Sequence, residues 1–90
     1  MINVHLPSQL AGLADGHKKL TVQATTLGEV FRRIDELAPM IRSQIFDSTG
    51  AIRPFVGLFL DDRQINEPGD SLLPVYEGSQ VLILMAVAGG

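Results

Sequence analysis

A single stretch of helical spacing near the middle of the chain constrains its fold most. Apolar residues recur there every three or four positions, which places one apolar stripe along a helix; they are Leu27, Val30, Phe31, Ile34, Leu37 and Ala38. Just before them, Thr26 and Glu29 have the spacing of a capping box, in which each side chain accepts a hydrogen bond from the other residue's backbone N–H. Pro39 ends or restarts this helix, and a short second helix is expected over residues 40–46.

Segments with the pattern of strands flank this helix on both sides. Apolar and polar residues alternate over residues 2–6 and 20–24, which predicts two half-buried strands. Residues 7–16 between them are expected to form a loop, because they contain proline and glycines. After the helix, the same reasoning predicts a strand over residues 55–60 and, beyond a turn, a short edge strand over residues 63–65.

A last apolar strand is expected over residues 81–84, after an irregular segment over residues 72–76. The resulting order is strand, strand, helix and then three strands, which predicts an α+β fold of the β-grasp type, a mixed sheet packed on one main helix. The first and last strands should lie at the centre of this sheet and run parallel. We expect the β-grasp domain to cover residues 1–84 and an extended C-terminal tail to cover residues 85–90.

Composition argues against several classes of function. The chain has 90 residues and a net charge of −3, so it lacks the clustered Lys and Arg of a surface that binds nucleic acid or an anionic membrane. Its longest apolar run has eight residues, too few to cross a membrane. Cysteine is absent, which excludes disulfides, thiolate zinc sites and cysteine nucleophiles. A cytoplasmic protein is expected.

The residues offer little that an enzyme could use. Neither histidine, His5 or His17, has a recognisable triad pattern with Ser and Asp, and both fit exposed surface positions better. The glycine-rich motifs that bind phosphate are absent. The pair Asp61-Asp62 fits a turn better than a metal site, because Asp readily hydrogen-bonds the backbone of a turn. We therefore expect no bound cofactor and no metal, and any ATP chemistry would belong to another protein.

The chemistry is expected in the last six residues instead. Met85-Ala86-Val87-Ala88-Gly89-Gly90 lose side-chain bulk step by step towards a terminal carboxylate. Transfer of AMP to that carboxylate would give a mixed anhydride that a sulfur nucleophile can attack. Glycine suits this role, since without a Cβ it passes through a narrow channel. Six extended residues span roughly 20 Å, which is enough to enter the buried active site of a partner.

With these features the chain resembles the ubiquitin-like sulfur-carrier family, which serves molybdopterin, thiazole and cysteine synthesis. The likeness covers nearly the whole length, and its motifs are Leu6-Pro7, Thr26-Leu27-Gly28-Glu29, Arg53-Pro54-Phe55-Val56, Leu60-Asp61-Asp62, Glu77-Gly78-Ser79-Gln80-Val81 and Ala86-Val87-Ala88-Gly89-Gly90. The ending and the helix start look most like the cysteine-synthesis branch. Ser79 and Met85 depart from the family pattern, in which Asp and Pro are frequent at these two positions.

The resemblance implies partners for the tail. An E1-like adenylating and sulfurtransferase enzyme would use ATP to activate Gly90, with Gly89 beside it, and a sulfur donor would convert Gly90 to a thiocarboxylate. A sulfur-acceptor enzyme would then receive the sulfur. A C-terminal processing protease would be needed wherever a precursor extends past Gly90. The chain itself would act as a carrier and would catalyse nothing.

A carrier also needs a docking face for its partners. If Val81 and Ile83 face the core, alternation places Leu82 and Leu84 on the opposite face of the sheet, where Phe59 would join them. The predicted partner-binding residues are these three outward residues together with Met85, Ala86, Val87 and Ala88. The alternatives are burial of this face under a loop and a strand that is simply apolar on both faces. Aspartate in place of Leu82 or Phe59 should weaken partner binding and leave the fold intact.

Three other functions remain open from the residues. The chain could be the small subunit of a molybdopterin-synthase-like complex, which would bind a larger catalytic subunit stably. It could be a ubiquitin-like modifier, which would join Gly90 to lysines of target proteins and give conjugates of higher mass. It could also be a β-grasp interaction module with an inert tail, for which deletion of Gly89 and Gly90 would change nothing.

Overall fold

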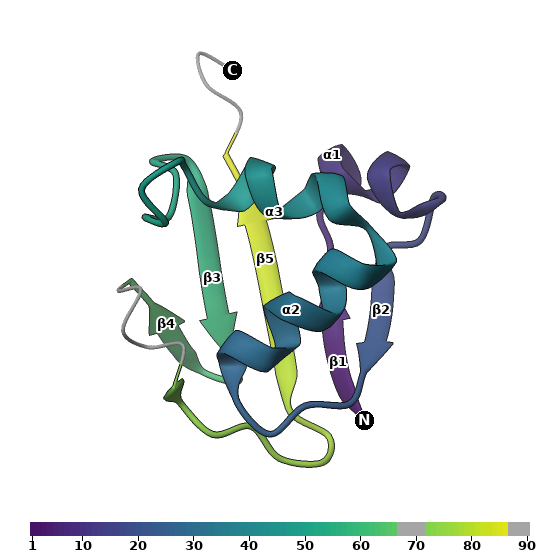
Figure 1. Cartoon of the computed structure of the whole chain (residues 1–90), viewed down its shortest axis with the longest axis vertical. Helices are drawn as coiled ribbons and strands as arrows, with labels where there is room; N and C mark the ends of the chain where they lie inside the picture. The colour runs from purple at the N-terminus through teal and green to yellow at the C-terminus, as the bar shows by residue number, and fades with distance from the viewer. Residues whose placement is uncertain (67–71, 87–90) are drawn as a thin grey trace.

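One mixed sheet organises the computed structural model, which describes residues 1–66 and 72–86 (Figure 1). Within these residues the sheet has five strands, in the order β2-β1-β5-β3-β4. The strands are β1 (Ile2–His5), β2 (Lys19–Val22), β3 (Val56–Leu60), β4 (Arg63–Ile65) and β5 (Gln80–Met85). The central strands β1 and β5 are parallel, and the other neighbours are antiparallel. The predicted β-grasp topology is confirmed.

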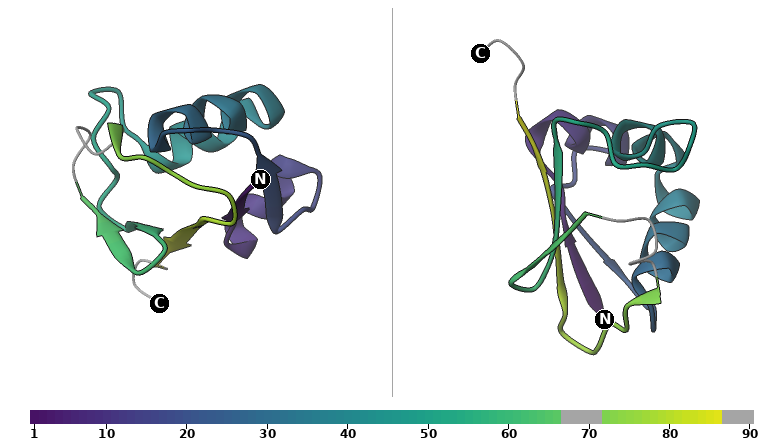
Figure 2. Two further views of the ribbon diagram at one scale, coloured as in Figure 1. Left: turned by 90° about the horizontal axis from the view of Figure 1, so that it is seen from below. Right: turned by 90° about the vertical axis from the view of Figure 1, so that its left-hand side faces the viewer.

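Helices cover one face of this sheet. The main helix α2 (Leu27–Leu37) and the shorter α3 (Pro39–Ile45) pack on that face, and in the described part of the chain no helix covers the other (Figure 2). A short helix α1 (Ser8–Ala11) and a 3₁₀ turn η1 (Gly12–Ala14) connect β1 to β2 and add apolar side chains to the core. The sheet therefore has one buried face and one open face.

Alternation along the strands builds the core. In β5 the side chains of Val81 and Ile83 are buried, as predicted, and they lie in one apolar cluster with the stripe of α2. The members that α2 contributes are Leu27, Val30, Phe31 and Ile34. Burial of this many branched side chains is the main source of stability in a domain of this size, at about 25 cal/mol for each Å² of apolar surface removed from water.

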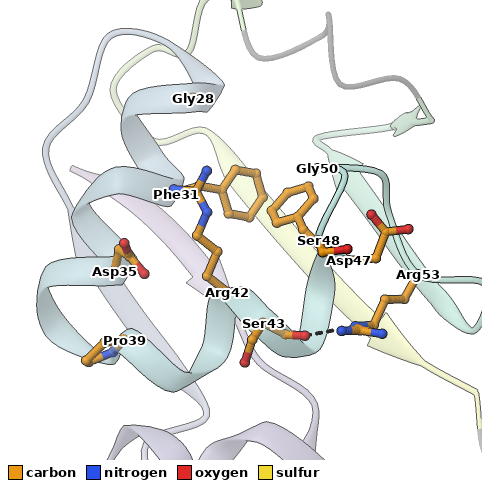
Figure 3. A pocket seen from close by; sticks show the side chains of 11 residues that line it. Gly28, Phe31, Asp35, Pro39, Arg42, Ser43, Asp47, Ser48, Gly50 and Arg53 are labelled. Carbon is orange, nitrogen blue, oxygen red and sulfur yellow. Dashed lines mark hydrogen bonds between the residues drawn. The ribbon is translucent and has the colours of Figure 1, made fainter.

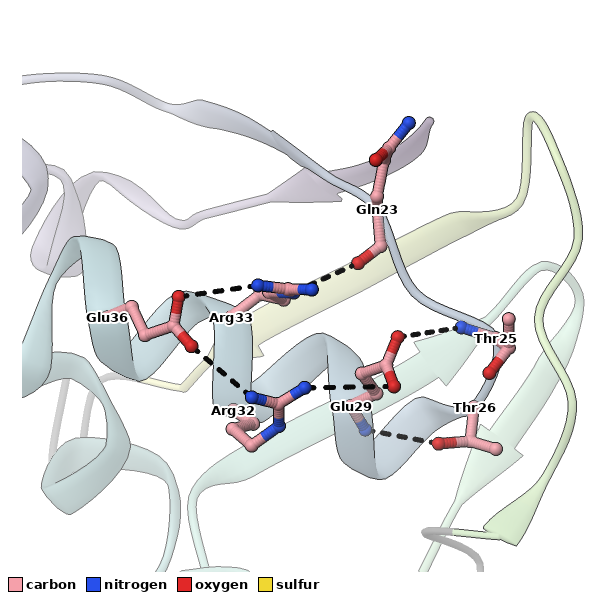
Figure 4. A network of polar contacts seen from close by, with 7 residues as sticks. All are labelled: Gln23, Thr25, Thr26, Glu29, Arg32, Arg33 and Glu36. Carbon is pink, nitrogen blue, oxygen red and sulfur yellow. Dashed lines mark hydrogen bonds and ion pairs between the residues drawn. The ribbon is translucent and has the colours of Figure 1, made fainter.

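The start of α2 is held by the predicted cap, with one difference. Thr26 Oγ1 accepts a hydrogen bond from the backbone N–H of Glu29 at 3.2 Å, but the Glu29 carboxylate accepts from the N–H of Thr25 instead of Thr26 (Figure 4). On the exposed side of the helix, Arg32 forms ion pairs with Glu29 and Glu36. Exposed pairs of this kind contribute little each, about 0.3–0.5 kcal/mol, so the cap and the buried stripe determine where the helix lies.

Two sequence predictions about this part of the molecule are wrong. Residues 8–14, expected to be a loop, form α1 and η1, in which Leu10 and Ala14 are buried. Leu37, expected in the apolar stripe of α2, is 60% exposed. The helix ends at Leu37, and the next residue, Ala38, leaves the helical conformation with φ −150° and takes the buried position.

Several boundaries move by one or two residues. The second strand covers Lys19–Val22 instead of 20–24, and β5 continues through Met85, which pairs with Val56 of β3. The predicted tail residues Val87, Ala88, Gly89 and Gly90 lie outside the described residues, as do residues 67–71. The division into a domain over residues 1–84 and a tail over residues 85–90 stays a prediction.

Candidate functional site

The open face of the sheet carries a small apolar surface near its centre. Leu82 and Leu84 on β5 are 38% and 46% exposed, and Phe59 on β3 is half-buried. The register places Phe59 opposite Leu82, and Gly57 opposite Leu84. We call the surface formed by Phe59, Leu82 and Leu84 the outer patch. The prediction that these side chains face away from the core is confirmed.

Gly57 gives the outer patch its shape. A Cβ atom at this position would lie 3.4 Å from Cε2 of the Phe59 ring and 3.9 Å from Cβ of Leu84. The ring of Phe59 therefore extends along the sheet over the space that a side chain at position 57 would take. Because Gly57 has no side chain, the ring of Phe59 and the side chain of Leu84 both come close to the space above its Cα atom.

Polar side chains surround the outer patch. Asn3 and His5 lie on the same face of β1, and Gln64 of β4 lies opposite Phe59. His5 Nε2 is within hydrogen-bonding distance of Oε1 of Gln80 at the start of β5. An apolar centre with a polar rim is the usual anatomy of a protein–protein contact, and an exposed apolar patch on a small domain commonly marks such a site.

The tail begins at the end of β5, next to this patch. The backbone N–H of Ala86 donates a hydrogen bond to the carbonyl of Phe55 at 2.9 Å, which continues the pairing of β5 with the segment before β3. Ala86 is exposed, whereas Met85 is half-buried and packs against the core. Of these two predicted partner-binding residues, Ala86 is therefore the more accessible.

Phe55 is a feature that the sequence analysis did not assign to the site. Its side chain is 57% exposed, although it is large and apolar, and it lies where the tail leaves the sheet. The sequence pattern predicts a strand over residues 55–60, but Phe55 precedes the strand, which begins at Val56. The only signal in the sequence is its place in the motif Arg53-Pro54-Phe55-Val56.

A groove of about 770 Å³ lies on the helical side, between α2, α3 and the loop over residues 47–53 (Figure 3). The rings of Phe31 and Phe46 pack edge to face in this groove, with 5.2 Å between the ring centres. The guanidinium of Arg42 lies 6.0 Å from the centre of the Phe46 ring. The lining contains Ser and Asp side chains but no histidine. The groove therefore holds no nucleophile–base pair of the Ser-His type.

The carboxylate of Asp47, which borders this groove, is already used by its own loop. Asp47 Oδ1 accepts hydrogen bonds from Thr49 Oγ1 at 2.5 Å, from Thr49 N at 2.8 Å and from Ala51 N at 3.1 Å. These bonds, above all the one from the Thr49 hydroxyl, lower the pKa of Asp47, because they favour the charged form. Asp47 is therefore a loop-forming residue and is not poised as a general base.

Asp47 is expected to titrate below its ordinary pKa of 3.8. Because the folded pKa is lowered, the stabilising effect of the ionised carboxylate is present above pH 3.8 and is lost as the pH falls through the folded pKa. An NMR titration of the side-chain carboxyl carbon measures this midpoint. Thr49→Ala should move it back towards 3.8, and a wild-type midpoint at or above 3.8 would contradict the hydrogen bonds to this loop.

The described residues contain neither a cluster of metal ligands nor a membrane-spanning helix. Among residues 1–66 and 72–86, no three His, Cys, Asp or Glu side chains gather as they would around a metal ion. Asp61 instead has a left-handed backbone with φ 53°, and its side chain accepts a hydrogen bond from the N–H of Gln80, which is the turn role expected from the sequence. No helix in the described ranges has the length and apolarity to span a membrane.

Comparison with known proteins gives relatives of the same length. No family model matches the chain. It is 29% identical over 91 residues to the sulfur carrier protein CysO of Mycobacterium tuberculosis, and the match covers 99% of this chain and 98% of that protein. A crystal structure of Mycobacterium tuberculosis CysO matches the fold with a TM-score of 0.85 and 25% identity, over 97% of this chain and 100% of that one.

Two further solved structures share the architecture. A chain of the Amycolatopsis orientalis BexX/CysO complex matches with a TM-score of 0.86 and 22% identity, and both chains are covered completely. SAMP1 from Haloferax volcanii matches with a TM-score of 0.79 and 17% identity, over 99% of this chain and 98% of that one. At these identities the two matches establish the fold alone, which is the ubiquitin-like β-grasp.

Proposed function

Because this chain belongs to the ubiquitin-like sulfur-carrier family, in the CysO branch, we propose that it carries sulfur for cysteine biosynthesis. The observation that carries the proposal is the end-to-end match with CysO, in sequence and in fold. The outer patch and the exposed start of the tail support it, since a carrier must bind its partners through its surface while its terminus reacts.

The chemistry of the proposal takes place on Gly90. A carboxylate oxygen of Gly90 attacks the α-phosphorus of ATP in an E1-like enzyme, and pyrophosphate leaves. Hydrosulfide from the sulfur source then attacks the acyl carbon, AMP leaves with the bridging oxygen, and loss of the proton leaves a thiocarboxylate at the terminus. A persulfide donor would instead give an acyl disulfide, which a thiol must reduce to release the thiocarboxylate. A carboxylate with a pKa near 3.5 is ionised at neutral pH and does not react with nucleophiles, which is why the step through AMP is required.

The chain acts as a protein cosubstrate in this scheme. The E1-like adenylating and sulfurtransferase enzyme binds ATP and catalyses both steps, and a sulfur-acceptor enzyme receives the product. The outer patch, formed by Phe59, Leu82 and Leu84, docks on these partners, and Gly89 and Gly90 enter their active sites. A processing protease is needed only if a precursor continues past Gly90. The proposed location is the cytoplasm.

The mass of the intact protein tests the proposal. Wild-type protein incubated with the E1-like enzyme, ATP and a sulfur source should gain the mass difference between one sulfur and one oxygen atom. A variant that lacks Gly90, and wild type without ATP, are the controls and should keep their mass. An unchanged wild-type mass, with an activating enzyme that converts another carrier under the same conditions, would overturn the proposal.

Other measurements distinguish the functions that the sequence leaves open. A ubiquitin-like modifier would appear as conjugates of higher mass on lysine-containing proteins. The small subunit of a molybdopterin-synthase-like complex would elute with a larger catalytic subunit in size-exclusion chromatography. A plain interaction module would behave the same with and without Gly89 and Gly90.

A further inference from the structure

The segment from Arg53 to Phe55 ties the helical layer to the start of the tail. The backbone N–H of Arg53 donates to the carbonyl of Ile45 at 2.8 Å, and Arg53 Nε donates to the carbonyl of Ser43 at 2.8 Å, both at the end of α3. On the other side, the carbonyl of Phe55 accepts the hydrogen bond from Ala86. The segment is therefore held from two directions, and its side chains are presented in a fixed place.

The side chains of this segment remain open to solvent. Phe55, Pro54 and Arg53 are all exposed, and together with Val56 and Met85 they border a shallow hollow of about 450 Å³ beside the end of α3. Within residues 1–66 and 72–86, no ion pair involves Arg53. Its guanidinium uses Nε to hold Ser43 and is near enough to the Asp47 carboxylate to help lower the pKa of that group, but no hydrogen bond within the described residues occupies its two Nη groups, which are therefore able to bind a ligand.

We propose that Arg53 and Phe55 form a second docking surface, the tail-base contact, for the E1-like enzyme that receives the tail. This inference rests on the proposed function. Gly90 follows Ala86 by four residues, which span at most about 14 Å. An enzyme that reacts with Gly90 inside a buried site must bring its entrance within that distance of Ala86, and Phe55 is the residue that hydrogen-bonds Ala86.

The chemistry of the tail-base contact indicates what the entrance offers. An exposed aromatic ring on a fixed backbone packs well into an apolar socket on a partner. An arginine without an ion-pair partner binds a carboxylate through two parallel N–H groups. Aromatic residues and arginine are also enriched among the residues that dominate binding energy at interfaces. We therefore assign an apolar socket with an Asp or Glu at its edge to the enzyme's entrance.

The tail-base contact lies beyond the Leu84 end of the outer patch, away from Leu82. Leu82 precedes Ala86 by four residues, or about 13 Å of extended strand, whereas Phe55 lies directly beside Ala86. Loss of the tail-base contact should therefore impair entry of the tail even when binding to the outer patch is preserved.

Matched variants test the tail-base contact. With the E1-like enzyme that converts wild type, Phe55→Ala should raise Kd by about tenfold or more, and Arg53→Gln by about threefold. Arg53→Gln should also reduce the salt dependence of Kd, while Arg53→Lys keeps it, because the charge remains. The controls are Tyr76→Ala, an aromatic that is 70% exposed on the segment before β5, and Arg63→Gln on the exposed edge strand; both should stay within about twofold of wild type.

Circular dichroism and the conversion of wild type, followed by intact mass, separate the possible outcomes. Circular dichroism checks that each variant is folded. If Phe55→Ala unfolds, Phe55→Leu, which keeps an apolar side chain, replaces it. Wild type that is not converted at all would overturn the proposed function. Wild type that is converted, together with Phe55 and Arg53 variants whose Kd and salt dependence equal those of the controls, would overturn the tail-base contact alone.

Discussion

Replacement of Ile83 by aspartate is expected to unfold the protein, whereas the same replacement at Leu82 should leave it folded. Ile83 is fully buried in the central strand β5, in the same apolar cluster as the stripe of α2. The change removes about 1.5–3 kcal/mol of apolar burial and adds a buried carboxylate without a partner, which costs several kcal/mol more. The sum is comparable to the whole stability of a small domain, about 5–15 kcal/mol.

The free energy of unfolding should change much less for Leu82→Asp, because Leu82 is on the open face of the sheet. Its side chain is 38% exposed, so the carboxylate of an aspartate there remains hydrated. The cost is the loss of the partial apolar burial of Leu82 and the weaker strand preference of Asp, about 1 kcal/mol, without the penalty of a fully buried charge. Urea denaturation followed by circular dichroism compares the two variants. With the enzyme that converts wild type, Leu82→Asp should raise Kd by about tenfold or more, since a charge would replace an apolar contact at the centre of the patch.

The two results that would contradict this prediction point to different errors. If Leu82→Asp also unfolds, Leu82 contributes to the core, and the outer patch is not a free surface. If Leu82→Asp is folded and binds the enzyme as wild type does, the outer patch has no role in docking. Because Ile83 and Leu82 are neighbours in one strand, the pair controls for effects of the backbone.

Replacement of Gly89 by valine is expected to abolish thiocarboxylate formation while Kd for the activating enzyme changes by about threefold or less. In the proposed function, docking depends on the folded domain, and Gly89 is placed beside the reacting carboxyl. Valine adds a β-branched side chain at that position, which a channel shaped for glycine excludes. Intact mass gives the extent of conversion, and calorimetry gives Kd.

A valine at Gly12 provides the matched glycine-to-valine control. Gly12 is exposed, has a φ of −62°, and a Cβ atom there would meet no other atom within 4 Å, so Gly12→Val should be converted at a rate within about threefold of wild type. Full conversion of Gly89→Val would show that the enzyme does not enclose the tail closely. Loss of binding together with conversion would make Gly89 part of the docking surface.

Local patterns predicted most of the fold correctly. The period-2 alternation in β5 placed Val81 and Ile83 in the core and Leu82 on the open face, because a strand turns each successive side chain to the opposite side. The capping residues located the start of α2 for a similarly local reason: Thr26 binds a backbone group only three residues away. Both signals depend on neighbours in the sequence.

Short elements and helix ends were predicted less well. The helix α1 and the turn η1 have four and three residues, too few to show a helical period. Leu37 fits the stripe of α2 by spacing, yet it is exposed because the chain leaves the helix at Ala38. The position of a helix end depends on what the next segment packs against, and this information is not in the helix itself.

The sequence by itself determined the β-grasp order and the two faces of the last strand, because both follow from the period of a strand or helix. The tertiary structure decided which side chains surround the start of the tail. Phe55 lies beside Ala86, and Arg53 lies against Ser43, through hydrogen bonds between segments distant in the chain. Such contacts depend on how the sheet and α3 pack together, so only the tertiary structure reveals the tail-base contact.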